Sequence, residues 1–343
     1  IKAGKFDPPS FSVQSAAPPK HDPAPLDQPP VADRQRAAAP SAGDYATRLP
    51  ILPTKIAHPG YPASMVDRPR LYRRLDDWRR LRGLAIFAQA GYGKSSLVSR
   101  WLDVAGLRGQ TAWVNLDEDD ADPARFVHYV AAALEGVRPG ALELVQPILV
   151  DQRGTPSHAL QHLLSTFEQL APAGVADPHV LLVLDDWQLI QSPAVDALLL
   201  TMLEQGPPTL HLVILARHRT ALRLARLHAQ EKLAFLTVDD LRFTAGEVAA
   251  YLWAKGFDAT TEVEMAELTA RSEGWITALQ LAVLSLRHPG DVGELIAALQ
   301  GDHDWLAEYL VGEVLDRQTP ELQRFLLETS ILDEFNAPLC AAV

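Results

Sequence analysis

The chain has 343 residues, which is enough for two or three domains of roughly 150 residues each. Its 31 Lys and Arg against 43 Asp and Glu give a net charge of −12, which disfavours a surface that binds nucleic-acid phosphates unaided. The single cysteine, Cys340, excludes an intramolecular disulfide framework and a cysteine-based zinc site. No run of about 18 apolar residues and no signal-peptide pattern is present. We therefore expect a cytoplasmic protein without a membrane segment, and the start at Ile1 indicates a processed or trimmed chain.

The first 48 residues differ from the rest in composition. They are rich in Pro, Ala, Asp and Ser and lack the apolar periodicity that a buried core requires. We expect residues 1–48 to form a disordered or clinging tail.

From Leu52 onward, short apolar runs alternate with helical patterns. Strands are predicted at residues 85–91, 111–117, 179–190 and 210–218, and helices at residues 95–107 and 122–134. Asp122 can cap the second helix, and Pro123 suits its first turn. Such alternation predicts an α/β domain, here residues 49–240, with a parallel sheet covered by helices on both faces.

After Val238 the strand pattern stops and helices follow. The run TAGEVAAYLWAKG places Thr244 as N-cap, Glu247 at the capping-box position and Gly256 as the C-terminal stop. We expect a helical domain at residues 241–300. Residues 301–343 are again helical in pattern and end without a terminator, as if their domain were cut short.

The segment IFAQAGYGKSSL, residues 86–97, matches a relaxed phosphate-loop pattern in which Ala88 replaces the first glycine. Gly91 and Gly93 would let backbone N–H groups turn toward phosphate oxygens, and Lys94 would neutralise the terminal phosphates. Ser95 would contribute a hydroxyl to Mg²⁺. The predicted nucleotide-binding loop comprises Ala90, Gly91, Tyr92, Gly93, Lys94, Ser95 and Ser96; a chance glycine turn is the alternative.

Two acidic residues end the third apolar run, and an arginine ends the fourth. Asp185 is predicted to hold Mg²⁺ with Ser95, and Asp186 to orient or deprotonate the attacking water. Arg217 could reach a terminal phosphate and distinguish ATP from ADP. A common strand-to-loop transition for the acids and a surface position for the arginine are the alternatives.

A set of segments in chain order resembles a known family. The segments are ILPTKIAHP, MVDRPRLYRRL, AGYGKSSLVSRW, WVNLDEDDADPARFVHYV, VLLVLDDWQLI, LARHR, LRFTAGEVAAYL, SEGWITALQLAVLSL and YLVGEVLDRQTPELQRFLLETSIL. Over about residues 51–343 they are similar to the ATPase half of MalT-like LuxR-type transcription regulators, which are STAND-class signalling ATPases.

The resemblance implies a P-loop NTPase sheet, a helical domain and, at residues 301–343, the start of a winged-helix domain. These domains clamp ADP in a resting monomer, which inducer and ATP open into an oligomer. Inducer recognition and DNA binding belong to C-terminal domains that are absent here. The resemblance also assigns Val66 and Arg68 to the adenine side of the site, where a salt-bridging arginine at a helix start is the alternative.

The segment GWITAL, residues 274–279, occupies the position of a Gly-x-Pro motif that touches the base in related ATPases. Ile276 replaces the proline, which weakens the case for adenine contact by this segment. Trp275 could equally pack in a core or face the base.

Other patterns have simpler interpretations. His158 and His162 have the spacing of two metal ligands but lack a third. The acidic run at residues 116–122 could touch a metal-bound water, although a solvated loop and helix cap is the preferred interpretation. The basic cluster is predicted to make interdomain or nucleotide contacts and comprises Arg217, Arg219, Arg223 and Arg226.

Three functions compete at this point. The first is a signalling switch with slow ATP hydrolysis, which binds ATP or ADP with Mg²⁺ and self-associates in the full-length protein. The second is a metabolic P-loop kinase, for which the sequence offers no lid and no acceptor pocket. The third is a scaffold independent of nucleotide, against which the intact Lys94, Ser95 and Asp185 argue.

Overall fold

The computed structural model describes residues 50–174, 176–219, 224–257, 261–286, 288, 290–299, 311–315 and 319–330. All of them lie in one compact unit of the chain. The predicted tail, Arg223, Cys340 and most of the segment 301–343 lie outside the described residues.

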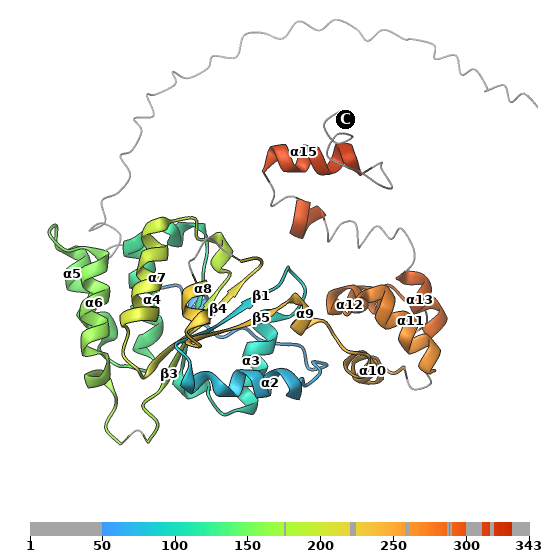
Figure 1. Cartoon of the computed structure of the whole chain (residues 1–343), viewed down its shortest axis with the longest axis horizontal. Helices are drawn as coiled ribbons and strands as arrows, with labels where there is room; N and C mark the ends of the chain where they lie inside the picture. The colour runs from blue at the N-terminus through green and yellow to red at the C-terminus, as the bar shows by residue number, and fades with distance from the viewer. Residues whose placement is uncertain are drawn as a thin grey trace, which may run out of the picture. The chain divides into compact units, whose positions relative to one another are not determined.

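A five-stranded parallel sheet forms the centre of the larger part (Figure 1). Its strands are β1 (Gly83–Phe87), β2 (Thr111–Asn115), β3 (Val180–Asp185), β4 (Leu210–Ala216) and β5 (Leu233–Thr237). They lie in the order β2-β3-β4-β1-β5, and every pairing is parallel. All carboxyl ends therefore share one edge, and the loops that follow β1, β3 and β4 meet there.

Helices cover both faces of this sheet because successive strand residues face opposite sides. On β1, Ala85 and Phe87 pack into one core and Leu84 and Ile86 into another. The first core contains residues of α4 (Pro123–Glu135), α5 (Ala141–Val150), α6 (Pro156–Thr166) and α7 (Pro193–Gln205). The second contains residues of α2 (Pro69–Leu75) and α3 (Lys94–Val104).

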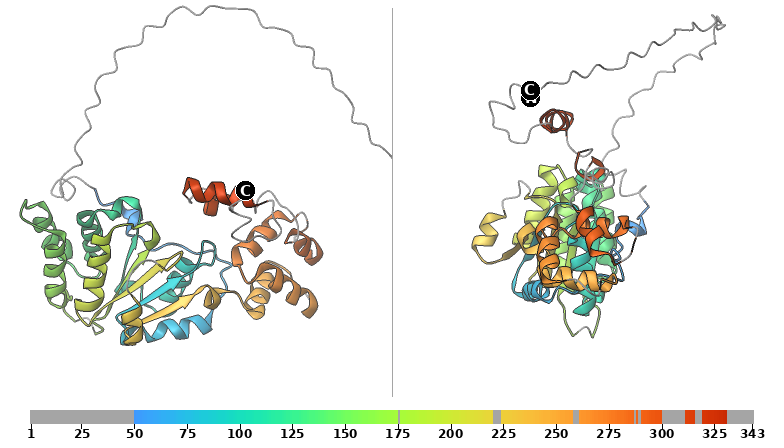
Figure 2. Two further views of the ribbon diagram at one scale, coloured as in Figure 1. Left: turned by 45° about the horizontal axis from the view of Figure 1, so that its top comes forward. Right: turned by 90° about the vertical axis from the view of Figure 1, so that its right-hand side faces the viewer.

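A separate bundle follows the sheet, shown in orange in Figures 1 and 2. It consists of α10 (Ala245–Ala254), α11 (Glu262–Ser272), α12 (Ile276–Ser285) and α13 (Val292–Ala298). Val248, Leu252, Leu268, Leu279 and Leu295 form its core and are fully buried. We call α10–α13 the helical bundle.

The remaining elements are short. They are α8 (Ala225–Ala229), α9 (Val238–Leu241), α15 (Pro320–Thr329), a π-helical turn (Val311–Leu315) and 3₁₀ turns at Pro53–Lys55, Asp76–Arg80, Arg108–Gln110, Glu118–Ala121, Phe167–Leu170 and Trp187–Leu189. None of the helices among the described residues is long and apolar enough to cross a membrane.

The predicted helix caps are confirmed. Asp122 directly precedes Pro123, the first residue of α4, and its carboxylate accepts a hydrogen bond from the Arg125 N–H at 2.8 Å. Thr244 and Glu247 form the reciprocal capping box of α10, and Gly256 has the left-handed φ of 87° that stops the helix. The four predicted strands are also present as β1–β4.

The predicted fold class, a P-loop NTPase sheet covered on both faces and followed by helices, is confirmed. The structure adds β5 and the hairpin of α5 and α6, none of which the sequence pattern indicated. β5 lies at a sheet edge, where only Leu233 and Leu236 are fully buried, so it lacks the continuous apolar run of the inner strands. The domain boundaries near residues 48, 240 and 300 stay predictions.

Candidate nucleotide site

The loop between β1 and α3 contains two glycines in the left-handed conformation. Gly91 and Gly93 adopt left-handed φ values of 80° and 74°, and α3 begins immediately afterwards at Lys94. At Gly91 a side chain is also excluded by contact, because an added Cβ would lie 2.6 Å from both Thr277 Oγ1 and Trp275 Nε1. Ala88 fits at the first position of the motif, where its N–H bonds to the Ala216 carbonyl on β4.

Lys94 is enclosed by this loop. Its side chain is 8% exposed, and Nζ donates to the carbonyls of Ala88 at 2.7 Å and Gln89 at 3.2 Å. Burial lowers the pKa of Lys94, while the charges of Asp185 and Asp186 oppose that shift. The ammonium is thus fixed among backbone oxygens at the N-terminus of α3.

Asp185 and Ser95, the two predicted metal ligands, are near neighbours. The Asp185 carboxylate is 5% exposed at the end of β3. Burial, with a further contribution from the Asp186 charge, raises the pKa of Asp185 to about 6, while the Ser95 hydroxyl and Lys94 oppose the increase. No group of three His, Cys, Asp or Glu side chains in the described part of the chain could hold a metal by itself. Two oxygen ligands fit Mg²⁺, which keeps waters and phosphate oxygens in its shell.

Asp186 has an uncommon backbone conformation for a residue other than glycine. Its φ of 60° and ψ of 38° are left-handed, and its N–H donates to Asp185 Oδ1 at 2.9 Å. Gln188 Nε2 donates to Asp186 Oδ1 at 2.8 Å, and Gln188 Oε1 accepts from the Arg217 N–H at 3.0 Å. The amide of Gln188 therefore links the acid after β3 to the backbone after β4.

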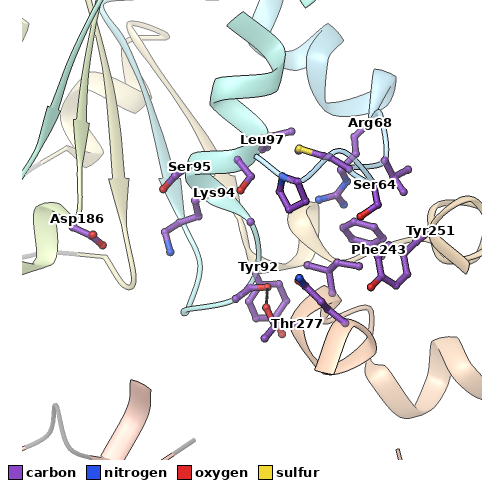
Figure 3. A pocket seen from close by; sticks show the side chains of 18 residues that line it. Ser64, Arg68, Tyr92, Lys94, Ser95, Leu97, Asp186, Phe243, Tyr251 and Thr277 are labelled. Atoms are coloured by element: carbon purple, nitrogen blue, oxygen red, sulfur yellow. Dashed lines mark hydrogen bonds between the residues drawn. The ribbon is translucent and has the colours of Figure 1, made fainter. Parts of the chain in front are cut away.

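A cavity of about 320 Å³ lies between the loop and the helical bundle. Its lining residues are Pro62, Ser64, Met65, Val66, Arg68, Gly91, Tyr92, Gly93, Lys94, Ser95, Ser96, Leu97, Asp186, Phe243, Tyr251, Ile276, Thr277 and Gln280. In Figure 3, Asp186 and Lys94 lie on one side of the pocket and Phe243 and Tyr251 on the other. One end is therefore polar and the other mainly apolar, as a phosphate-bearing ligand with a flat base requires.

The predicted site residues gather around this cavity with three exceptions. Val66, Arg68, Asp186 and the loop residues from Gly91 to Ser96 line it. Among the described residues, Ala90, Asp185 and Arg217 do not belong to its wall. Ser95 instead lowers the pKa of Asp185 from nearby, and the Arg217 charge acts on the pKa of Lys94.

Arg68 lines the cavity, but its guanidinium is engaged with the helical bundle. It is 2% exposed, contacts Glu247 Oε2 at 3.0 Å and donates to the Leu241 carbonyl at 2.8 Å. Arg70 also contacts Glu247, through Nε at 2.9 Å. Burial opposes ionisation of Glu247, but Arg70 and Arg68 outweigh it and lower the pKa of this carboxyl. The polar contacts of Arg68 are therefore those of the alternative interpretation, a salt-bridging arginine at a helix start, while its place in the cavity wall keeps the adenine-side role a prediction.

The segment that begins α12 reaches the loop itself. Trp275 Nε1 donates to the Ala90 carbonyl at 3.2 Å, and Thr277 Oγ1 donates to the Gly91 carbonyl at 2.8 Å. The Trp275 and Tyr92 ring centroids lie 6.4 Å apart. Despite the missing proline, Ile276 and Thr277 line the cavity, and Trp275 contacts the loop backbone.

The other candidates lie elsewhere. His158 is exposed on α6, four residues before His162, and no third ligand accompanies them in the described residues. The acidic run is not a solvated loop throughout, because Asp120 is fully buried and pairs with Lys55 and Arg125.

Several wall residues carried no sequence signal of function. Phe243, Tyr251 and Gln280 belong to the helical bundle or the segment before it, more than 140 residues along the chain from the loop. Met65 and Ser64 precede α2. Gln188 is not part of the wall but holds Asp186, and its position two residues after that acid was the one available hint.

The strand order, the left-handed glycines and the enclosed lysine define a P-loop NTPase fold with a candidate nucleotide site. A family model, the MalT winged helix domain, matches residues 311–343. The chain is 30% identical over 305 residues to the serine/threonine-protein kinase PknK of Mycobacterium tuberculosis, covering 88% of this chain and 27% of that protein. It is 30% identical over 294 residues to the HTH-type transcriptional regulator MalT of Yersinia pestis, covering 84% of this chain and 31% of MalT.

The predicted resemblance to MalT-like regulators is thereby confirmed, and the chain spans about 30% of the length of these relatives. Solved structures with some likeness include CDC6P from Pyrobaculum aerophilum, with 15% identity, a TM-score of 0.40, and coverage of 70% of this chain and 62% of that one. C. elegans PCH-2 has 10% identity and a TM-score of 0.41, with 69% of each chain covered. The fold assignment rests on the sheet and loop described above, since these scores are low.

Proposed function

We propose that this chain is the nucleotide-binding switch module of a MalT-like transcription regulator in the cytoplasm. The observation that carries the proposal is a single cavity walled both by the phosphate loop and by the helical bundle. A ligand in that cavity would touch both parts of the chain at once. Its binding and release would therefore change how strongly the bundle is held.

The ligand we propose is ADP or ATP with Mg²⁺. Backbone N–H groups of Gly91 and Gly93 and the Lys94 ammonium would bind the phosphates at the helix N-terminus. Ser95 and Asp185 would hold the metal, which supplies positive charge next to the phosphate oxygens. Val66 and the apolar residues around it would contact the base.

Hydrolysis would be slow. Asp186 would orient or deprotonate a water, with Gln188 holding its carboxylate. A switch must remain in each state long enough to be read, so we expect turnover well below the roughly 1 to 100 per second of kinases. In the longer protein, the ATP-bound form would self-associate, and inducer and DNA would bind through other domains.

Two sets of contacts support the proposed coupling. Arg68 and Arg70 attach the bundle through Glu247. Trp275 and Thr277 attach it to carbonyls of the phosphate loop. The second set uses the loop that would hold the phosphates. A rearrangement of that loop would therefore break or move the hydrogen bonds that hold the start of α12.

Protein-kinase activity finds no support beyond the name of PknK. The similarity covers 27% of that protein. Protein kinases cover ATP with a different glycine-rich loop and place their lysine on a strand, whereas Lys94 begins a helix.

Calorimetry with Mg²⁺ and ADP tests the proposal. Lys94→Ala removes the cation that faces the phosphates, and we expect at least about a tenfold loss of ADP affinity, as for loss of a charge-assisted contact. Lys232→Ala is the matched control, because Lys232 is exposed before β5 and away from the cavity. Equal ADP affinity in both variants and the wild type would contradict the site.

A further inference from the structure

Tyr251 is a buried side chain whose hydroxyl oxygen makes no hydrogen bond within the described part of the chain. It extends from α10, is 5% exposed and lines the cavity opposite the phosphate loop (Figure 3). Its hydroxyl is buried and has no hydrogen-bond partner among the described residues. Lys255 approaches the ring, with Nζ 5.7 Å from the centroid, which is a contact with the ring face.

Two other hydroxyls in this part of the chain have partners. The Thr277 hydroxyl donates to the Gly91 carbonyl at 2.8 Å, and the Tyr72 hydroxyl donates to Asp67 at 3.2 Å. A buried hydroxyl without a partner destabilises the folded state, because the hydrogen bonds it makes to water in the unfolded chain are not replaced. A phenylalanine at position 251 would fill nearly the same space without that cost, so the hydroxyl is explained best by a partner that arrives from outside.

The surroundings indicate the chemistry of that partner. Val66, Phe243 and Ile276 also line the cavity and present apolar surface. Burial raises the pKa of Tyr251 to about 12, so the hydroxyl keeps its proton at neutral pH and can both donate and accept. A flat, mainly apolar ring with nitrogen atoms at its edge matches these walls and this single polar group.

We propose that the Tyr251 hydroxyl hydrogen-bonds to the polar edge of a purine base and makes the cavity selective for a nucleotide over base-free polyphosphate. The inference rests on the proposed nucleotide binding and adds a specificity-determining residue to it. It also explains why α10 contributes to the wall: the helix would carry the group that recognises the base.

The test is Tyr251→Phe, measured with Mg²⁺-ADP and with inorganic pyrophosphate as the base-free probe. Loss of one neutral hydrogen bond should weaken ADP binding about 3- to 10-fold and leave pyrophosphate binding, measured by competition, unchanged. Without nucleotide, Tyr251→Phe should melt about 2–4 °C higher than the wild type, because the unpaired hydroxyl is gone. Tyr72→Phe is the matched control; it loses a bond to Asp67, so it should melt lower and bind ADP normally.

The outcomes separate the two proposals. If wild-type protein binds neither probe, the nucleotide site itself is wrong. If it binds both and Tyr251→Phe binds ADP as tightly as the wild type, the role of Tyr251 is overturned. Equal weakening of ADP and pyrophosphate, or a lower melting temperature without nucleotide, would likewise overturn it, because either result would make Tyr251 a structural residue.

Discussion

The amino and carboxyl ends of the parallel strands, here called the amino edge and the carboxyl edge of the sheet, differ in how their buried polar groups are paired. At the amino edge, His211 is 2% exposed; its Nδ1 lies 2.6 Å from the Leu81 carbonyl and its Nε2 2.8 Å from His179 Nδ1. Arg82, just before β1, donates to the carbonyls of Leu203 at 3.2 Å and Pro207 at 2.9 Å. Here His211 and Arg82 both find their hydrogen-bond partners within the same domain.

At the carboxyl edge several polar groups have an unfavourable backbone conformation, a shifted pKa or no hydrogen-bond partner. Asp185 is buried with a pKa raised to about 6, and Asp186 has a left-handed backbone. Lys94 is buried beside them, and Tyr251 faces the same cavity without a partner. Strain and unsatisfied groups are typical of sites that await a ligand, whereas satisfied networks contribute stability. The comparison therefore predicts that changes at the carboxyl edge alter binding and turnover, and changes at the amino edge alter stability.

Substitution of Asp186 should have the largest effect. Asp186→Asn keeps an oxygen for the Gln188 bond, and Asn tolerates the left-handed conformation, so the fold should persist. Loss of the base should slow ATP hydrolysis about 10²–10⁴-fold while ATP affinity stays within about threefold of the wild type. Phosphate release and calorimetry measure the two quantities.

Asp177→Asn is the control from the opposite edge. Asp177 precedes β3, as Asp186 follows it, and Asp177 pairs with Arg79 at 2.5 Å. This variant should hydrolyse ATP at the wild-type rate. If Asp186→Asn abolished ATP binding, or if both variants hydrolysed normally, the assigned role of Asp186 would be wrong.

The sequence predicts the parts of this edge that are encoded locally. The caps at Asp122 and Thr244 depend on neighbours three residues away, and the loop from Ala90 to Ser96 is a contiguous motif. Alternation of apolar runs predicted β1–β4 because all or nearly all residues of these strands are buried. β5 was missed because only Leu233 and Leu236 of its residues are fully buried, whereas β2, the other edge strand, is buried along most of its length.

The remainder of the site depends on tertiary contacts between distant residues. Glu247 contacts Arg68 across 179 positions, and Thr277 contacts Gly91 across 186. No pattern within either segment specifies its partner, so only the family resemblance, through residues 274–279, indicated that the helical bundle contributes to the wall. Tyr251 belongs to the same class, since a tyrosine at a half-apolar helix position usually indicates core packing.

The amino edge yields the second prediction, which concerns stability. Burial, with smaller contributions from the nearby charges of Arg82 and Arg79, lowers the pKa of His211 to about 4, although the hydrogen bond to the Leu81 carbonyl opposes the shift. An unfolded histidine titrates near 6.5, so between pH 6.5 and about 4 the unfolded chain binds a proton that the folded chain does not. The free energy of unfolding should therefore fall as the pH is lowered, by at most about 3 kcal/mol from this residue.

His211→Gln should remove this part of the acid sensitivity, because an amide can donate to Leu81 and accept from His179 without titrating. Urea unfolding at pH 7.5, 6 and 5 measures the slope. The exposed His158, changed to Gln, is the control and should leave the slope unchanged. Identical slopes in His211→Gln and the wild type would contradict the prediction, whereas ADP affinity at pH 7.5 should be the same in all three proteins.

The smallest expected effect returns to the carboxyl edge and concerns Arg217. The N–H of this residue bonds to Gln188, and its charge lowers the pKa of Lys94, so it lies within electrostatic range of the phosphate-binding lysine. Arg217→Ala keeps the backbone bond and removes the charge; ADP affinity should change little, while the difference between ADP and a non-hydrolysable ATP analogue shrinks. Coupling energies of this kind are about 1–3 kcal/mol, so rates of limited proteolysis in the two nucleotides should differ several-fold in the wild type and converge in the variant. Arg219→Ala is the matched control, because that guanidinium stacks on the Phe235 ring at 5.1 Å. A ligand shifts a conformational equilibrium only through contacts that differ between the two states. A wild-type protein that is equally protected from proteolysis in both nucleotides would therefore argue against the switch. An Arg217→Ala protein that still distinguishes the two nucleotides would place the phosphate sensor at another residue.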